Sequence, residues 1–110
     1  MKKDAYERLQ PWLFYKNARQ RVIFFLIADG YTVGDLTKMQ IDDLKQIKLP
    51  PELDVDRDNF LEGRTSGPAF VYPSGKLIPH TNYYRLIRTT AEKVLGRPMS
   101  QEKFREYINT

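Results

Sequence analysis

The sequence predicts a single domain, residues 1–110, that is mainly α-helical with a small β element. Most of the chain carries apolar residues at helical spacing between residues that begin and end helices. Only residues 69–72 and 77–78, with the Ser74-Gly75 turn between them, have the pattern of two short strands. The length of 110 residues suits one domain, and 41% hydrophobic with 29% charged residues is an ordinary globular composition.

The first part of the chain predicts two helices. Residues 4–10 form a short helix, and Pro11 either ends it or opens the next one. Asn17 caps the following helix, which stops at Gly30. Its run Val22–Ala28 is apolar on nearly all sides, which is typical of a helix at the centre of a domain.

The middle of the chain predicts two more helices and a strand. Thr32 and Asp35 have the spacing of a capping box and begin a short helix. Residues 44–50 alternate imperfectly between apolar and polar side chains, which we interpret as a short strand. Two prolines open a helix over residues 50–61, and Gly63 stops it.

The last part of the chain predicts a long helix and a short one. The long helix covers residues 82–95, with His80 or Thr81 as its cap, and the short one follows the cap Ser100. We interpret the aromatic pair Tyr83 and Tyr84 as core, with contact to a sugar-phosphate backbone as the alternative. The apolar residues expected to form the core stripe of the long helix are Tyr84, Ile87, Ala91, Val94 and Leu95.

Basic residues are unevenly distributed along this chain of net charge +4 and pI near 9.4. Residues 1–55 carry nearly balanced charges, whereas residues 64–105 contain only two acidic residues, Glu92 and Glu102. Such a distribution indicates a basic face for a polyanion, because neutralising phosphates releases counterions. An ordinary solvated surface is the other interpretation. The basic residues of this second segment are Arg64, Lys76, Arg85, Arg88, Lys93, Arg97, Lys103 and Arg105.

Several classes of function lack their sequence signals here. There is no cysteine and only one histidine, His80, which is interpreted as a cap or turn residue, so neither a disulfide framework nor a zinc site is expected. The chain has no glycine-rich phosphate loop, no HExxH and no nucleophile elbow. Its longest apolar run is too short for a bilayer, and no apolar signal core follows Met1. We therefore expect a cytoplasmic protein without cofactor, metal or membrane contact.

The stretch LIADGYTVGDLTKMQIDDL, residues 26–44, resembles a helix-turn-helix on spacing alone. Its second helix offers only Lys38 and Gln40 as side chains able to hydrogen-bond bases, and Asp35 has the wrong charge. We therefore interpret this stretch as part of the core and not as a DNA-reading motif.

Three blocks of the sequence, residues 28–44, 47–96 and 99–110, follow one another with the order and spacing of a known family. They resemble the catalytic domain of tyrosine recombinases, the phage integrases, with its TGLRxSEL, DID and HkLRH boxes. The resemblance covers residues 17–110 and implies a minimal helical fold of that kind, preceded by an N-terminal helical segment, residues 1–16. The matching residues are Gly30, Asp35, Leu36, Ile41, Asp42, Phe104 and Arg105.

The departures from that family concern its catalytic groups. Thr32 stands where the family has its first phosphate-binding arginine, and Glu102 stands where it has a histidine. The hairpin that carries the catalytic lysine is missing, and the nucleophilic tyrosine would follow Thr110. Only Arg105 is retained, and Glu102 or Glu106 is expected to pair with a basic neighbour. Because phosphoryl transfer depends on several positioned cationic donors, we expect no strand cleavage.

The resemblance, together with the basic segment, predicts a catalytically inactive regulator from a phage or mobile element that binds double-stranded DNA. An internal salt bridge to a glutamate is the alternative for Arg105. The predicted phosphate contacts are Lys76, Arg85, Arg88, Lys103 and Arg105.

A second interpretation is a protein-interaction module that docks on a recombinase or another partner, or forms a homodimer, without binding DNA. The aromatic residues Trp12, Phe14 and Tyr15 belong either to such a contact or to the core.

Overall fold

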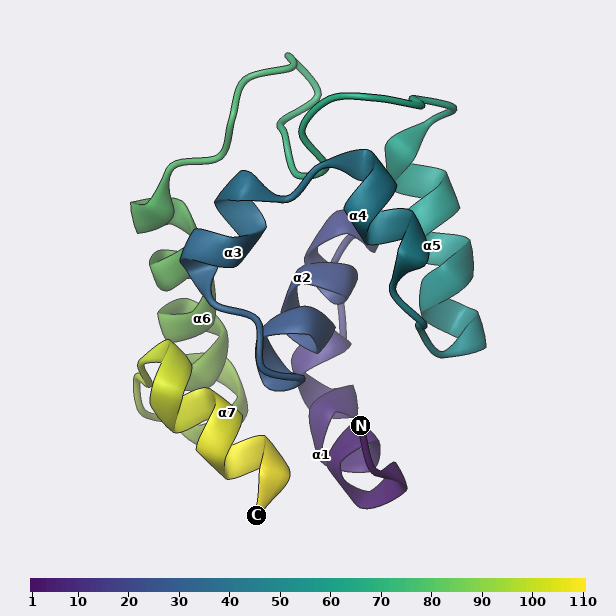
Figure 1. Cartoon of the computed structure of the whole chain (residues 1–110). Coiled ribbons are helices and arrows are strands. Elements are labelled where there is room, and N and C mark those ends of the chain that lie inside the picture. The colour runs from purple at the N-terminus through teal and green to yellow at the C-terminus, as the bar shows by residue number, and fades with distance from the viewer.

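The computed structural model describes all 110 residues, Met1–Thr110, as seven helices (Figure 1). The prediction of a mainly helical domain is confirmed. None of the helices combines the length and apolar character that crossing a bilayer requires. The helices are α1 (Lys3–Leu13), α2 (Ala18–Ala28), α3 (Val33–Lys38), α4 (Ile41–Gln46), α5 (Pro51–Leu61), α6 (His80–Leu95) and α7 (Gln101–Asn109).

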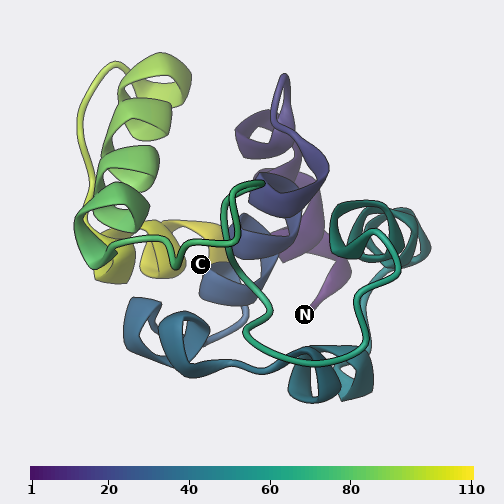
Figure 2. The same ribbon diagram turned by 90° about the horizontal axis from the view of Figure 1, so that it is seen from above.

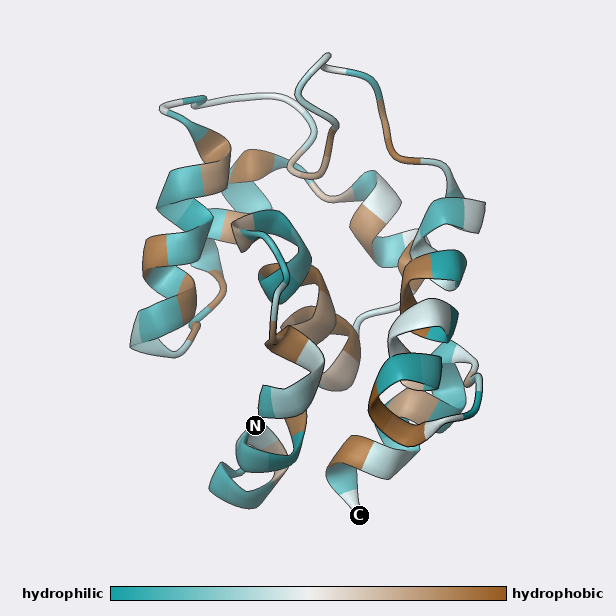
Figure 3. Cartoon of the chain, turned by 180° about the vertical axis from the view of Figure 1, so that it is seen from behind, coloured by the Kyte–Doolittle hydropathy of each residue, from teal (hydrophilic) through white to brown (hydrophobic).

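Helix α2 is the centre of the fold, as its all-round apolar run predicts. Every residue of Val22–Ala28 is buried, and α1, α5 and α7 all pack against α2. Figure 2 shows α2 between α5 on one side and α6 on the other, and Figure 3 shows hydrophobic colour concentrated on α2 at the centre of the molecule. A capping box between Asn17 and Gln20 begins this helix, with the Asn17 side chain accepting from the Gln20 amide at 2.8 Å.

Three aromatic rings join α1, α2 and α7 into one core. The Trp12 ring centroid lies 4.6 Å from that of Phe104 and 6.3 Å from that of Phe24, and all three side chains are fully buried. Aromatic pairs at such separations contribute about 0.5–1.5 kcal/mol beyond their buried area. Trp12 is therefore a core residue, whereas its neighbours Phe14 and Tyr15 are 67% and 95% exposed.

The β element is smaller than predicted. It consists of a single antiparallel bridge between Val71 and Leu77, in which the Tyr72 amide donates to the Lys76 carbonyl at 2.9 Å. A second isolated bridge joins Gln40 to Pro68 and ties the long loop to the start of α4. The segment between α5 and α6 is thus a loop that folds back over the helices (Figure 1).

The strand predicted for residues 44–50 is wrong. The chain forms α4 up to Gln46 and then an irregular connection. Asp43 accepts a hydrogen bond from the Gln40 amide at 3.0 Å, which begins a helix, and Ile41 and Leu44 meet the core three residues apart. Local capping therefore outweighs the weak alternation of the apolar residues.

The start and the core face of α6 also differ from the prediction. The cap is Pro79 instead of His80 or Thr81, and Tyr83 is buried while Tyr84 is 43% exposed. Tyr83 shares a face with Ile87 and the later core residues at intervals of three and four, and Tyr84 is turned about 100° away from Tyr83. In α1, Pro11 lies inside the helix and neither ends it nor opens a new one.

A partly buried ion pair fixes α5 against α2. Arg21 forms two hydrogen bonds to the Asp56 carboxylate, at 2.7 and 2.6 Å, and Asp56 is only 7% exposed. The hydrogen bonds that Arg21 donates to Asp56 raise the pKa of the Arg21 guanidinium, so Arg21 is charged at neutral pH. Arg21 also donates to the Lys16 carbonyl, which ties the α1–α2 turn to the same contact.

Candidate nucleic-acid interface

Two of the predicted phosphate contacts share one side of α6. Arg85 and Arg88 are both exposed and lie three residues apart, which places them on the same side of the helix. Neither side chain forms a salt bridge or a hydrogen bond within the chain, although Glu92 follows one turn after Arg88. Both guanidinium groups therefore keep their full charge and their donors for a ligand outside the chain.

Lys76 lies on the loop that leads into α6. Its backbone carbonyl closes the small β bridge, and its side chain is exposed and has no ion-pair partner. A single exposed lysine of this kind has an ordinary solvated environment. Its position before α6 makes it a peripheral member of the candidate interface.

The two predicted contacts on α7 have different environments. Lys103 is 72% exposed and lies 4.0 Å from the Glu106 carboxylate, so Glu106 has the basic partner expected for one of the two glutamates, and Glu102 has none. Arg105 is half-buried and donates to the carbonyls of Ile27 at 2.9 Å and Tyr31 at 2.8 Å. The structure therefore groups Arg85 with Arg88 but places Lys103 and Arg105 in separate surroundings.

Arg105 stabilises the end of the central helix. The last four carbonyls of a helix lack partners within it, and Ile27 belongs to the last turn of α2. Asn109, one turn further along α7, adds a hydrogen bond to the Ala28 carbonyl at 2.8 Å. The salt bridge to a glutamate considered for Arg105 is wrong, since its partners are backbone carbonyls.

Thr32 has a local structural role. Its hydroxyl accepts from the Asp35 amide at 3.0 Å, and its own amide donates to the Asp35 carboxylate at 2.8 Å. These two hydrogen bonds form the predicted capping box at the start of α3. The backbone hydrogen bond from Thr32 holds the pKa of the Asp35 carboxyl below its usual value, with a smaller effect from the charge of Lys38.

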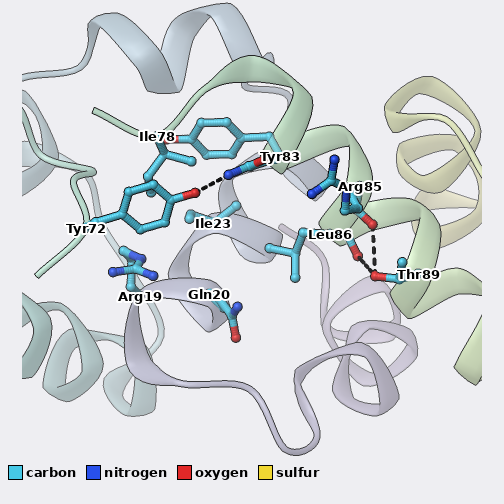
Figure 4. Close-up of a pocket in the computed structure, with 10 residues that line it drawn as sticks. Arg19, Gln20, Ile23, Tyr72, Ile78, Tyr83, Arg85, Leu86 and Thr89 are labelled. Atoms are coloured by element: carbon cyan, nitrogen blue, oxygen red, sulfur yellow. Dashed lines mark hydrogen bonds between the residues drawn. The ribbon is translucent and has the colours of Figure 1, made fainter. Parts of the chain in front are cut away.

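A pocket that no sequence pattern predicted lies beside Arg85. This pocket, about 240 Å³ in volume, lies between α2, α6 and the loop before α6, and we call it the α2–α6 pocket (Figure 4). Two of its lining residues are arginines, Arg19 and Arg85, and no aspartate or glutamate lines it. No spacing signal pointed to Arg19, because its partners come from the loop, more than fifty residues away in sequence. The apolar surfaces of the pocket are Ile23, Ile78 and Leu86, with the ring of Tyr72.

Several polar groups in this pocket are held in place or left without partners. The Arg19 guanidinium lies 5.5 Å from the centre of the Tyr72 ring and donates to the Val71 carbonyl at 3.2 Å. The Asn82 amide donates to the Tyr72 hydroxyl, which fixes the loop to α6 (Figure 4). By contrast, Arg19 Nε and the Tyr83 hydroxyl are buried without a hydrogen-bond partner. Burial raises the pKa of the Tyr83 phenol to about 12, so it stays a neutral donor at physiological pH.

The polar side chains form no cluster of the kind that binds a metal: no group of three or more histidine, aspartate or glutamate residues is close enough together. Comparison with known proteins adds no relative: no family model, no curated protein and no solved structure matches the chain.

Proposed function

We propose that this protein binds double-stranded DNA non-covalently, through exposed cations on and around α6, and does not cleave it. The supporting observation is the pair Arg85 and Arg88, which share one side of a helix and have no carboxylate partner. Lys76, on the loop that leads into α6, adds a further exposed positive charge. By its resemblance to phage integrases, the chain would act as a regulator encoded by a phage or mobile element.

Arginines without internal partners are suited to phosphate recognition. A guanidinium offers a planar fork of donors that matches two phosphate oxygens, and it stays charged at any physiological pH. Arg57 shows the contrast within this chain, since its donors bind the carbonyls of Leu44 and Ile47 and the Asp54 carboxylate. Contacts between arginines and phosphates position a protein on duplex DNA without reading the base sequence.

The non-catalytic part of the proposal rests on the roles of Thr32 and Arg105. In the resembled family the corresponding arginines hold the scissile phosphate. Here Thr32 caps α3 and Arg105 binds the end of α2. Removing one positioned donor from such a site costs roughly two to three orders of magnitude in rate. We therefore infer a binding function without strand cleavage.

The test is a measurement of binding to a short random-sequence duplex as salt is raised from about 50 mM to about 200 mM. Loss of each phosphate contact lowers the slope of log affinity against log salt by about 0.9. The double variant Arg85→Ala/Arg88→Ala should therefore bind more weakly at low salt, with a slope smaller by about two units.

The matched control is Lys45→Ala, which removes an exposed positive charge from α4, outside the basic segment. It should leave both affinity and slope nearly unchanged. Wild-type protein that does not bind duplex DNA at low salt contradicts the proposal. A double variant that binds like the wild type places the interface elsewhere.

A second candidate function is protein interaction through Phe14 and Tyr15. These two rings are 67% and 95% exposed and contact each other with centroids 4.5 Å apart. Tyr15 also has a positive φ of 62°, which is unfavourable for a side chain with a Cβ atom. A strained and exposed aromatic residue contributes little to the fold, and residues of this type are enriched at protein interfaces.

The interaction function is tested by the concentration dependence of the molecular mass in solution. If Phe14 and Tyr15 mediate self-association, the wild type forms dimers that the variant Phe14→Ser/Tyr15→Ser does not form. A chain that stays monomeric at all concentrations and binds duplex DNA favours the first candidate.

A further inference from the structure

The α2–α6 pocket has a charge that is not neutralised within the chain. Arg19 and Arg85 both line it, and neither has an aspartate or glutamate partner. Arg21, two residues after Arg19, shows the opposite case, with a carboxylate held at 2.6 Å. Two unpaired guanidinium groups beside one pocket favour an anionic ligand.

Donors without partners point to the same kind of ligand. The Tyr83 side chain is 1% exposed, and its hydroxyl has no hydrogen-bond partner, nor does Arg19 Nε. A buried donor left unpaired costs about 1–3 kcal/mol, so native proteins satisfy nearly all of them. Both atoms are shielded from solvent, so a ligand in the pocket would satisfy them only if the pocket wall moved.

The size and walls of the pocket limit what can enter. Its volume of about 240 Å³ is below the roughly 300–1,000 Å³ typical of sites that enclose a whole small molecule. The walls combine the apolar side chains Ile23, Ile78 and Leu86 with the amide of Asn82. Such a pocket holds one planar ring system with polar edges, while the rest of the ligand stays outside beside Arg85.

We propose that the α2–α6 pocket takes the base of an unpaired DNA nucleotide, whose phosphate binds Arg85. This inference rests on the proposed function, because the phosphates on either side of the unpaired nucleotide would lie along the α6 face that carries Arg88. Figure 4 shows Arg85 at the edge of the pocket, on the same helix as Tyr83 and Leu86. A free nucleotide has the same chemistry, and the experiment below separates the two sources.

The experiment compares three duplexes of the same sequence: one blunt, one with a single unpaired thymidine at a 3′ end, and one with an abasic sugar-phosphate in place of that thymidine. The last two differ only in the base. We expect the thymidine duplex to bind about tenfold more tightly than the abasic one, the order of magnitude for one base held against an aromatic wall.

The variant Thr89→Trp places a bulky ring at the pocket wall from an exposed position on α6. It should remove the tenfold preference, taken as the ratio of the thymidine and abasic affinities of each variant, because Thr89 lies one turn from Arg85 and its substitution can also change binding to the blunt duplex. Thr81→Trp makes the same substitution at an exposed position of α6 that does not line the pocket, and it should keep the preference. Leu86→Trp fills the pocket from within and provides a second test if Thr89→Trp folds poorly.

The outcomes separate this inference from the proposed function. Equal binding of the thymidine and abasic duplexes overturns the pocket assignment, even where the blunt duplex still binds. Absence of duplex binding, combined with saturable binding of thymidine monophosphate that Thr89→Trp abolishes, overturns DNA as the source and assigns the pocket to a free nucleotide. A preference that survives both Thr89→Trp and Leu86→Trp places the base outside the pocket.

Discussion

Replacing Arg105 by alanine should destabilise the fold by about 3 kcal/mol. The Arg105 side chain donates to the carbonyls of Ile27 and Tyr31 at 2.9 and 2.8 Å, in a half-buried position at the end of the central helix. Each hydrogen bond from a charged donor contributes about 1.5–3 kcal/mol, and the carbonyls lose these partners when the guanidinium is removed. The loss is large against a total stability of roughly 5–15 kcal/mol.

The assay is urea unfolding followed by circular dichroism, with the free energy taken from the midpoint and slope. A loss of about 3 kcal/mol corresponds to a melting temperature lower by about 10 °C or more for a domain of this size. Arg105→Lys should recover only about 1 kcal/mol, because an ammonium group cannot form the same fork of two bonds. The control on the same helix is Lys103→Ala, which removes an exposed pair with Glu106 and should cost less than about 1 kcal/mol.

Unfolding of Arg105→Ala at the wild-type urea concentration, or an equal loss of stability in Lys103→Ala, would contradict this role of Arg105. The same variants also examine the predicted DNA contact of Arg105. At a temperature where Arg105→Ala is fully folded, a loss of affinity equal to that of Arg85→Ala would show that Arg105 contributes to DNA binding as well as to the fold.

Four further substitutions test particular contacts, each measured by urea unfolding unless stated. Asp56→Ala should cost about 3 kcal/mol or more, because it leaves the Arg21 charge unpaired beside α5; a loss below about 1 kcal/mol would show that solvent replaces the carboxylate. Gly30→Ala should cost about 1–3 kcal/mol because φ is +118° there. This cost would come from the backbone conformation alone, since no neighbouring atom lies within 4 Å of the added Cβ atom. Tyr15→Gly should gain up to about 1 kcal/mol by removing the strain of a positive φ, and a loss would mean that the exposed ring packs on the fold. Tyr83→Phe should be neutral or stabilising, because the buried hydroxyl has no partner. Burial raises the pKa of Tyr83 from its ordinary 10.0 to about 12 in the folded chain, so the unfolded chain releases this proton first. The contribution of Tyr83 to the stability of the wild type should therefore be complete below about pH 10 and be lost between about pH 10 and 12. Tyr83→Phe should lack that part of the alkaline loss, and identical pH profiles would contradict it.

Local signals predicted the helices well where capping residues and apolar spacing agreed. The caps at Asn17 and Ser100 and the capping box at Thr32 are present as expected. The helix that the sequence did not predict, α4, also begins with a capping box, but its N-cap residue is the glutamine Gln40, which is a weak signal for a helix start. The error over α6 came from two adjacent tyrosines, because spacing alone allowed either of them to belong to the core stripe.

The candidate interface was only partly predictable. Arg85 and Arg88 could be placed together because helical spacing puts neighbours three apart on one side. No local pattern shows that Arg105 binds the carbonyls of Ile27 and Tyr31, since those partners are more than seventy residues away in sequence. The α2–α6 pocket could not be predicted for the same reason, because its walls come from three separate segments of the chain.

By itself, the sequence determined that the chain is a mainly helical domain with the apolar segment Val22–Ala28 at its centre, because burial of apolar surface depends on composition and period. Only the tertiary structure decided which charged side chains are free to bind a ligand. Whether a guanidinium has a partner depends on helices that are far apart in sequence and close together in space. Arg105 and Arg88 therefore look alike in sequence and differ completely in their surroundings.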